Sequence, residues 1–296
     1  MRRAWLAGLA WLLGVVGSPA ETLRIATYNV ENYGAADRMV AAGYRRDYPK
    51  PEAAKAALRA VIRAMAADLL ILQEMGGPAY LEELRRDLRA EGLDYAFGHV
   101  VDGDDENRYL AVLARRPPRA VKPHADLTFR YLGGEGRLKR GLLEVTLATP
   151  AGDITVWGVH LKSRFTDRAD DPMSATRRAG EATAIRDLIL RRHPAPGAAR
   201  FVVLGDFNDG PNSQAVRFTG RRGKTTIANL LPASDSRGET WTYAYRKEDT
   251  YQRVDHILVS PGLQPLVADG KAAICDVPET MSASDHRPVV VTLRLP

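Results

Sequence analysis

Polar side chains that could do chemistry stand at the ends of apolar runs spread over the whole sequence. They are Asn29, Glu74, His160, Asp206, Asn208, Asp255, Asp285 and His286. A polar residue that leaves a buried strand lies at the rim of a sheet, where side chains from distant segments can converge. Any one of them alone is explained as well by a turn or a solvated position. The same arrangement in many separate segments indicates a shared site.

The residue types in this set suit phosphoryl transfer. Carboxylate and amide oxygens without cysteine favour a hard cation, Mg²⁺ first, with Mn²⁺ or Ca²⁺ as alternatives. Histidines can bind phosphate oxygens or protonate a leaving group, and a further carboxylate can deprotonate water. A cation, a base and hydrogen-bond donors are what the hydrolysis of a phosphate ester requires.

The elements that position these residues follow from the hydrophobic periodicity. Strands are predicted over residues 23–29, 68–72, 109–114, 141–148, 154–160, 201–204, 253–260 and 288–295. Pro51 and Pro78 each begin a helix, the second closed by Gly92, and Ser174 is expected to cap a third. Because strands outnumber helices and several follow one another directly, we expect mixed sheets packed on each other with helices outside.

Six short segments carry a specific resemblance. Residues 26–30 (ATYNV), 72–74 (LQE), 158–163 (GVHLKS), 205–209 (GDFND), 254–258 (VDHIL) and 284–288 (SDHRP) occur in this order. Together they resemble the signature motifs of the endonuclease/exonuclease/phosphatase superfamily, over residues 25–290. The resemblance implies an α/β fold, a four-layer α/β sandwich of two mixed β-sheets packed together with helices on the outside.

Roles around the metal and the water are implied by this resemblance. Glu74 would be the principal metal ligand, with Asn29 and Asp285 beside the ion. Asp206 would activate or position the attacking water, and Asn208 would hold the water and the phosphate. The expected activity is that of a metal-dependent phosphodiesterase or endonuclease.

Contacts to the scissile phosphate are implied for two histidines. His286, oriented by Asp255, would lie on one side of the phosphate and His160 on the other. In pancreatic-type deoxyribonucleases a glutamate supports the second histidine, and Asn107 stands in its place here. An amide stabilises a charged imidazole less well than a carboxylate, so phosphate binding is expected of His160 rather than acid catalysis.

Further substrate contacts are expected from two basic residues. Arg140 resembles an arginine that contacts substrate phosphate in the same deoxyribonucleases, and a solvated strand position explains it equally well. Lys162, in the segment after His160, is the other candidate.

Nucleic acid, DNA first and RNA second, is the favoured substrate because basic residues follow two of the motifs. They are Arg164, Arg168, Arg177 and Arg178 in one group, and Arg217, Arg221, Arg222 and Lys224 in the other. Both groups could flank a groove that follows a sugar-phosphate backbone. Lipid head groups or small phosphate esters remain an alternative, and an inactive nucleic-acid-binding protein is a second one. No protein partner is inferred.

The N-terminus has the form of a secretory signal peptide. Arg2 and Arg3 precede an apolar run over residues 4–17, and small residues follow at 18 and 20. The run is shorter than a spanning helix of about 20 residues, so we expect cleavage after residue 20, no stable membrane insertion, and a secreted or periplasmic protein. Residues 21–296 would form one domain, whose single cysteine, Cys275, allows no internal disulfide.

Overall fold

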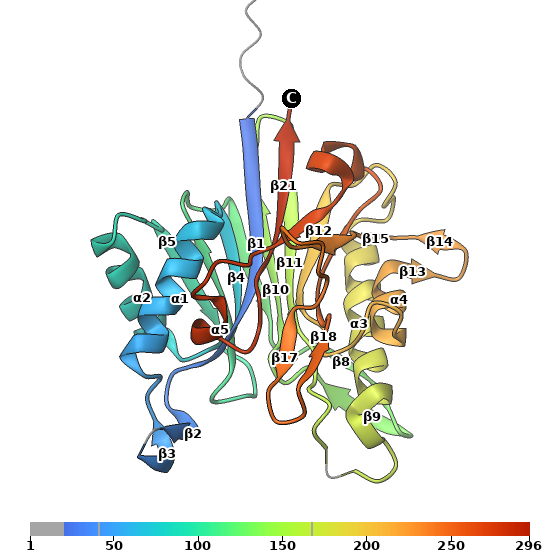
Figure 1. The fold of residues 1–296 in the computed structure, drawn as a ribbon. Helices are drawn as coiled ribbons and strands as arrows, with labels where there is room; N and C mark the ends of the chain where they lie inside the picture. Colours follow the sequence, from blue (N-terminus) through green and yellow to red (C-terminus); the bar gives the residue numbers. More distant parts are fainter. Residues whose placement is uncertain (1–20, 41, 167) are drawn as a thin grey trace, which may run out of the picture.

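Two β-sheets lie face to face in the middle of the protein, with helices on both outer faces (Figure 1). This computed structural model describes residues 21–40, 42–166 and 168–296. The expected signal peptide, residues 1–20, lies outside the described residues. The four layers confirm the predicted α/β sandwich of two mixed sheets.

The first sheet has seven strands, and both parallel and antiparallel neighbours. Their spatial order is β16 (Ala233–Ser234), β20 (Ala272–Ile274), β21 (Val289–Leu295), β1 (Glu21–Tyr33), β4 (Leu69–Met75), β6 (Tyr109–Ala114) and β5 (Phe97–Val101). Helices α1 (Glu52–Met65), α2 (Pro78–Ala90) and α5 (Thr280–Ala283) belong to this half of the molecule. Apolar residues of α1 and α2, among them Leu58, Ile62 and Leu84, pack against the outer face of the sheet.

The second sheet has six strands and carries the other helical layer. The spatial order is β15 (Asn229–Leu230), β19 (Asp255–Val259), β12 (Phe201–Asp206), β11 (Ile154–His160), β10 (Leu142–Leu147) and β7 (Ala120–His124). Helices α3 (Ala175–Arg192) and α4 (Gln214–Gly220) cover its outer face, with Ala182, Ile185 and Ile189 of α3 buried against the sheet as the sequence predicted.

Four small hairpins extend from the two sheets. They are β2 (Ala36–Val40) with β3 (Gly43–Tyr48), β8 (Thr128–Tyr131) with β9 (Gly134–Arg137), β13 (Arg221–Arg222) with β14 (Thr225–Thr226), and β17 (Tyr243–Tyr245) with β18 (Thr250–Gln252). Among the described residues, no helix is long and apolar enough to cross a bilayer.

Strand alternation explains why both faces of each central strand are apolar. In β4, Leu69 and Ile71 face the core between the sheets, whereas Leu70 and Leu72 face the helices. Successive side chains of a strand point to opposite faces, so a strand covered on both sides must be apolar throughout.

The two sheets pack closely at Gly158 of β11. A Cβ at this position would stand 2.8 Å from Cγ2 of Ile71 in the facing sheet.

Two details differ from the prediction. Ser174 occupies the N-cap position of α3, but its side chain makes no capping hydrogen bond. Instead the carboxylate of Asp171 accepts hydrogen bonds from the backbone N–H groups of Thr176 at 2.9 Å and Arg177 at 3.0 Å. Of the strands predicted in succession over 109–114, 141–148 and 154–160, the last two are the successive, antiparallel neighbours β10 and β11. The first is β6, which lies in the other sheet, and β7, β8 and β9 come between β6 and β10 in the chain.

The sheet topology brings the polar strand ends to one edge of the sandwich. β1 and β4 run parallel, as do β11 and β12, so their carboxyl ends meet. β21 is antiparallel to β1, and β19 is antiparallel to β12, so these strands begin at that same edge. In the ladder Asp206 pairs with His160 on one side and with Asp255 on the other.

Candidate active site

Asp206, at the end of β12, is held by hydrogen bonds to both carboxylate oxygens. Its Oδ1 accepts from the backbone N–H of Asn208 at 2.7 Å. Its Oδ2 accepts from the side-chain amides of Asn29 at 3.0 Å and Asn208 at 3.1 Å. The residue is 1% exposed, and burial raises the pKa of its carboxyl to about 7 although His286 opposes this. A carboxyl group with such a pKa can accept a proton near neutral pH.

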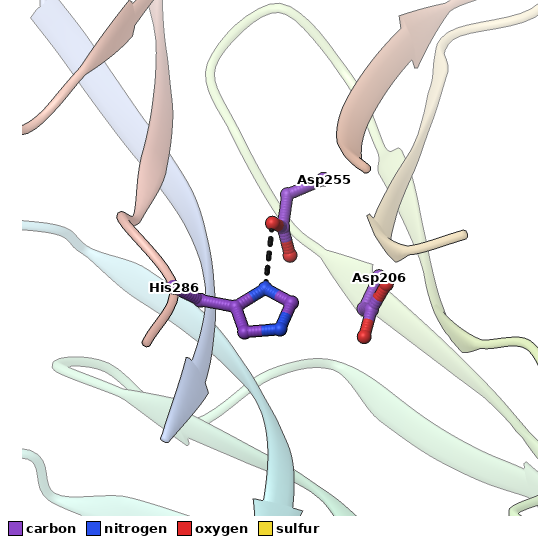
Figure 2. A group of neighbouring side chains, drawn as sticks. All are labelled: Asp206, Asp255 and His286. Carbon is purple, nitrogen blue, oxygen red and sulfur yellow. Dashed lines mark hydrogen bonds and ion pairs between the residues drawn. The ribbon is translucent and has the colours of Figure 1, made fainter. Parts of the chain in front are cut away.

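His286 and Asp255 form a buried pair beside Asp206 (Figure 2). Nδ1 of His286 lies 2.8 Å from Oδ2 of Asp255, which fixes the ring and leaves Nε2 for another partner. Burial alone would lower the pKa of His286, but the charges of Asp255, Asp206 and Asp285 raise it well above its usual range. The imidazole is therefore held in its charged form, which suits contact with a phosphate.

Ser284 connects this pair to the neighbouring sheet strand. Its Oγ donates to the backbone carbonyl of Asn29 at 2.8 Å and accepts from the backbone N–H of His286 at 3.1 Å. The serine is fully buried, so the backbone at His286 is fixed against the end of β1.

Glu74 reaches the site through an irregularity in β4. The register of β4 with β6 shifts between Leu72 and Met75, and Glu74 has a positive φ of 59°. A bulge of this kind re-aims a side chain at the end of a strand. Its Oε2 accepts from the backbone N–H of Asn32 at 3.1 Å, and Asn32 also has a positive φ, 53°. Backbone strain of this kind is concentrated at functional sites.

The carboxylates of Glu74 and Asp285 fit a hard divalent cation. Both line the same cleft, and both belong to segments that carry oxygen donors. Burial raises the pKa of Asp285 to about 6, with further raising effects from Glu31 and Glu74. Such crowded negative charge is what a bound cation would neutralise. Asn29, expected as a third ligand, uses its Oδ1 to accept from the backbone N–H of Glu31 at 3.0 Å and its Nδ2 to hold Asp206.

A second group of acidic and imidazole side chains is also close enough to bind an ion. Ligand atoms of Asp206, Asp255 and His286 lie within 4.8 Å of one another, and all three residues are buried. Hydrogen bonds already join His286 to Asp255, and Asp206 to Asn29 and Asn208, so these side chains have partners without an ion.

The cleft above these residues has a volume of about 580 Å³. The catalytic candidates Asp206, Asn208 and His286 lie on its lining with Glu74 and Asp285. The remaining lining residues come from the segment after β11, from the hairpin β17–β18 and from the residue before β19. They are Ser163, Arg164, Phe165, Met173, Tyr243, Tyr245, Glu248, Thr250, Gln252 and Val254.

His160 lies behind Asp206 and is not part of the described cleft lining. Its Nε2 is 3.6 Å from Oδ2 of Asp206, and its Nδ1 is buried without a hydrogen-bond partner among the described residues. Burial, with the charge of Arg140, lowers its pKa well below the usual range, so the ring is neutral. The support expected from Asn107 is not formed: Asn107 is exposed, and its backbone N–H points to Asp105 at 3.4 Å.

Arg140 and Lys162 have structural contacts that the sequence did not predict. Arg140 is 7% exposed rather than solvated; its Nε pairs with Asp105 at 2.9 Å and its Nη1 donates to the carbonyl of Leu161 at 3.1 Å. Lys162 donates from Nζ to the carbonyl and Oγ of Ser163, at 3.2 and 3.1 Å, and to the carbonyl of Phe165. Both side chains thereby position the chain that leaves His160.

The two basic groups are not equivalent in the structure. From the first group, Arg164 lines the cleft, whereas Arg178 is 2% exposed and pairs with Asp209 at 3.1 Å. The second group lies on and near β13–β14, which projects from the side of the molecule in Figure 1. None of its four residues belongs to the described cleft lining, and of the first group only Arg164 does.

Three charged or aromatic residues near the site were not predicted from the sequence. Arg108, the neighbour of Asn107, brings its Nε to 4.0 Å from Oε1 of Glu74. Lys50 is 3% exposed and donates to the carbonyl of Glu31 at 3.2 Å. The Tyr243 ring lies 4.8 Å from the His286 ring, with which it also shares an isolated bridge. In the sequence, only Arg108 could have been suspected of lying near the site, because it follows Asn107 directly.

Comparison with known proteins agrees with this geometry. The model of the endonuclease/exonuclease/phosphatase family matches residues 26–286. The chain belongs to this family. Proteins of the endonuclease/exonuclease/phosphatase family are hydrolases that generally use a divalent metal ion, and this member has the buried Asp-Asp-His group described above. No curated protein matches the chain in sequence.

Solved structures share the fold of this family member at low sequence identity. Sphingomyelinase C from Streptomyces griseocarneus is 15% identical, with a TM-score of 0.63 over 92% of this chain and 99% of that one. An endonuclease/exonuclease/phosphatase from Beutenbergia cavernae is 22% identical, with a TM-score of 0.58 over 93% and 72%. The human Nocturnin catalytic domain, solved with bound sulfate, is 15% identical, with a TM-score of 0.58 over 92% and 93%.

Proposed function

We propose that this protein is a Mg²⁺-dependent phosphodiesterase that hydrolyses nucleic acid. The observation that carries the proposal is that one cleft contains both an oriented carboxylate, Asp206, and a positively charged imidazole, His286. Asp206 has its carboxylate oriented by two amides, and His286 is held charged by Asp255. A base for water and a cationic contact for phosphate are the two parts that hydrolysis of a phosphate ester needs from side chains.

Each side chain has a place in this reaction. Asp206 takes a proton from water as the water oxygen attacks phosphorus and the ester P–O bond breaks. Asn208 and Asn29 keep the Asp206 carboxylate in position. The charged His286 donates a hydrogen bond to a phosphate oxygen. A divalent cation at Glu74 and Asp285 would neutralise charge on the phosphate and on the departing oxygen.

A nucleic-acid substrate is supported by the charge around the cleft. Arg164 lies on the cleft lining, and Arg108 stands beside Glu74. The whole chain has a formal charge of +6, of which Arg2 and Arg3 supply +2, so residues 21–296 carry +4. Positive charge next to a phosphodiester site favours a polyanionic substrate because each neutralised phosphate releases counterions.

The proposal is tested by digestion of supercoiled plasmid, linear DNA and RNA with purified residues 21–296. We expect cleavage with Mg²⁺, none with EDTA, and a loss of at least ~100-fold in Asp206→Ala and in His286→Ala. Circular dichroism of both variants checks that they fold. Near-wild-type turnover in either variant would contradict the assignment of these residues. Nicked plasmid before linear plasmid would indicate endonuclease cleavage.

A lipid phosphodiester is the second candidate, and one surface feature favours it. The hairpin β2–β3 exposes Met39 and Tyr44, which are 76% and 54% exposed, beside Arg45 and Arg46. Exposed apolar and basic residues together suit an interface of lipid and water. Hydrolysis of sphingomyelin vesicles, with all nucleic acids left intact, would replace the first proposal by this one. Hydrolysis of bis-p-nitrophenyl phosphate alone would favour a lipid or a small phosphate ester over nucleic acid.

An inactive nucleic-acid-binding protein is the third possibility. It predicts retained DNA binding in a gel-shift assay together with no metal-dependent turnover of any of these substrates. Turnover that is lost in Glu74→Ala would exclude it.

We also propose that the protein is secreted or periplasmic after cleavage of residues 1–20, leaving residues 21–296 as one domain. The support is the basic and apolar composition of residues 1–20. Expression of the full chain in a Gram-negative host, followed by fractionation and N-terminal sequencing, tests this. A mature protein that begins at Met1 in the cytoplasm would contradict it.

A further inference from the structure

An exposed aromatic ring lies on the lining of the catalytic cleft. Phe165 is 85% exposed and lines the cleft together with Met173, which is 54% exposed. The same cleft contains Asp206 and His286. Single exposed apolar residues are common on proteins. Two of them on the lining of the proposed active site are better explained by a ligand that covers them.

Side chains hold the backbone at Phe165 and before it. Before it, Lys162 donates to the carbonyl of Phe165, and Nε of Arg164 donates to the carbonyl of Asn208 at 3.2 Å. Arg178 then joins the two ends of the segment: its Nη1 donates to the carbonyls of Lys162 at 3.2 Å and Met173 at 2.7 Å.

The group that holds this segment is itself buried. Arg178 is 2% exposed and pairs with Asp209, which directly follows Asn208 of the catalytic segment. Glu181, also 2% exposed, accepts from the backbone N–H of Lys162 at 2.8 Å. The exposed ring is therefore presented from a fixed backbone that is coupled to the catalytic residues. A rigid aromatic group loses little conformational entropy when a ligand stacks on it.

We propose that Phe165 stacks on the nucleobase next to the scissile phosphate, with Met173 packing against the same base. The inference rests on the proposed nuclease function and deepens it. Every base has an aromatic face, so stacking of this kind tolerates any sequence. A thioether also packs well against a ring. Arg164, the residue before Phe165 and also on the lining, supplies positive charge for the sugar-phosphate backbone.

Stacking on Phe165 has a consequence for the strandedness of the substrate. A base in a duplex must leave its stack and its partner before it can lie on a protein ring, at a cost of a few kcal/mol. A base in a single strand does not have this cost. The enzyme therefore prefers single-stranded to double-stranded nucleic acid.

The experiment uses thymidine dinucleotide and its two analogues in which one base is replaced by an abasic spacer. Wild type should cleave the dinucleotide about 5- to 150-fold better, in kcat/KM, than at least one analogue, chiefly through KM. Phe165→Ala should reduce this ratio to near 1, and Phe165→Trp should restore it. Tyr251→Ala is the matched control, since Tyr251 is an exposed aromatic residue of β18 that does not line this cleft.

Each outcome separates the two proposals. A base preference that survives in Phe165→Ala, or that is absent from an active wild type, overturns the stacking inference and leaves the nuclease function intact. No cleavage of any dinucleotide or oligonucleotide by wild type overturns both. A matching loss of preference for a single-stranded over a double-stranded 20-mer in Phe165→Ala would support the inference independently.

Discussion

At the scale of single residues, the site depends on two buried groups whose pKa values are both raised but which the proposed reaction needs in opposite protonation states. Burial raises the pKa of Asp206 to about 7, and Asp255 helps to raise the pKa of His286 well above its usual range. Activity on this account needs Asp206 deprotonated and His286 protonated. The first condition is lost as pH falls through about 7, and the second is lost as pH rises through the pKa of His286.

Replacing Asp255 by Asn should move the alkaline limit of activity to lower pH. The change removes the charge that raises the pKa of His286, so the imidazole loses its proton at a lower pH than in wild type. We expect kcat/KM of Asp255→Asn to fall by at least ~10-fold relative to wild type at about pH 9, and by less near pH 7. A pH–rate profile measures this, and an unchanged alkaline limb would show that His286 does not depend on Asp255.

Arg108 and Asn107 offer a matched pair of substitutions. Arg108 lies 4.0 Å from Glu74 and its side chain is 41% exposed, whereas Asn107 is exposed without a side-chain contact to His160. Arg108→Ala should raise KM for DNA about 5-fold and weaken the salt dependence, because one positive charge beside the phosphate is lost. Asn107→Ala should stay within about twofold of wild type. A larger loss of activity in Asn107→Ala than in Arg108→Ala would instead favour the support of His160 that the sequence predicted for Asn107.

At the scale of elements, a buried cation joins the start of β21 to the segment that leads into β17. Arg287 follows His286 in the chain and is 2% exposed. Its Nη1 donates to Asp235 at 2.8 Å, its Nε donates to the carbonyl of Trp241 at 3.0 Å, and its guanidinium lies 3.4 Å from the centre of the Trp241 ring. These contacts fix the hairpin β17–β18, which supplies part of the cleft lining.

Arg287→Ala should reduce the free energy of unfolding by about 3–5 kcal/mol, because it leaves the buried carboxylate of Asp235 without its buried cation, although the backbone N–H groups of Arg237 and Glu239 still donate to it. Urea denaturation at pH 7 measures the loss. Arg294→Ala is the control, since Arg294 forms an exposed pair with Asp269 at 3.0 Å and should change stability by less than about 1 kcal/mol. Equal effects of the two substitutions would show that burial of the Arg287 pair has no energetic consequence.

The same pair predicts a dependence of stability on pH. Burial opposes ionisation of Asp235, but hydrogen bonds from Arg287 and from the backbone lower its pKa to about 2. A carboxyl whose pKa is lower in the folded state stabilises the protein above the unfolded pKa of about 4, and this stabilisation is lost as pH falls towards 2. The stability difference between wild type and Arg287→Ala should therefore narrow between pH 5 and pH 2. A constant difference over this range would contradict the pairing.

At the scale of the whole molecule, the site depends on how closely the two sheets pack. Glu74 and Asn29 come from the first sheet, and Asp206 and Asp255 come from the second. The hydrogen bond from Asn29 to Asp206 crosses this boundary at 3.0 Å. Any change in the distance between the sheets therefore moves the carboxylates proposed to bind the metal relative to the proposed base.

Gly158→Ala tests this coupling between core and site. The added methyl would stand 2.8 Å from Cγ2 of Ile71 in the facing sheet, so something must shift. We expect a loss of about 1–3 kcal/mol in stability and a fall in kcat that exceeds the change in KM. Gly197→Ala is the control because nothing lies within 4 Å of a Cβ at that position. Wild-type stability and kcat in Gly158→Ala would show that the sheets can separate without cost.

Much of this protein was determined by local sequence. Apolar periodicity predicted the central strands and the helices after Pro51 and Pro78, because a strand or helix that buries one face must repeat apolar residues at its own period. The ordered motifs identified the family, and the polar residues at strand ends included Asp206, Asp255, His286 and Glu74. These lie together because the parallel pairs β1–β4 and β11–β12 end at one edge of the sandwich, and the antiparallel strands β19 and β21 begin there.

Only the tertiary structure decided which of several similar neighbours reaches the site. Arg108 rather than Asn107 approaches Glu74, and Arg164 lines the cleft while Arg178 is buried. Phe165 and Tyr243 had no local pattern that marked them as cleft residues. The direction of a side chain in a loop is set by long-range pairing, such as the register shift of β4 against β6, and one residue of register turns a side chain to the opposite face. Periodicity within a segment contains no information about that pairing.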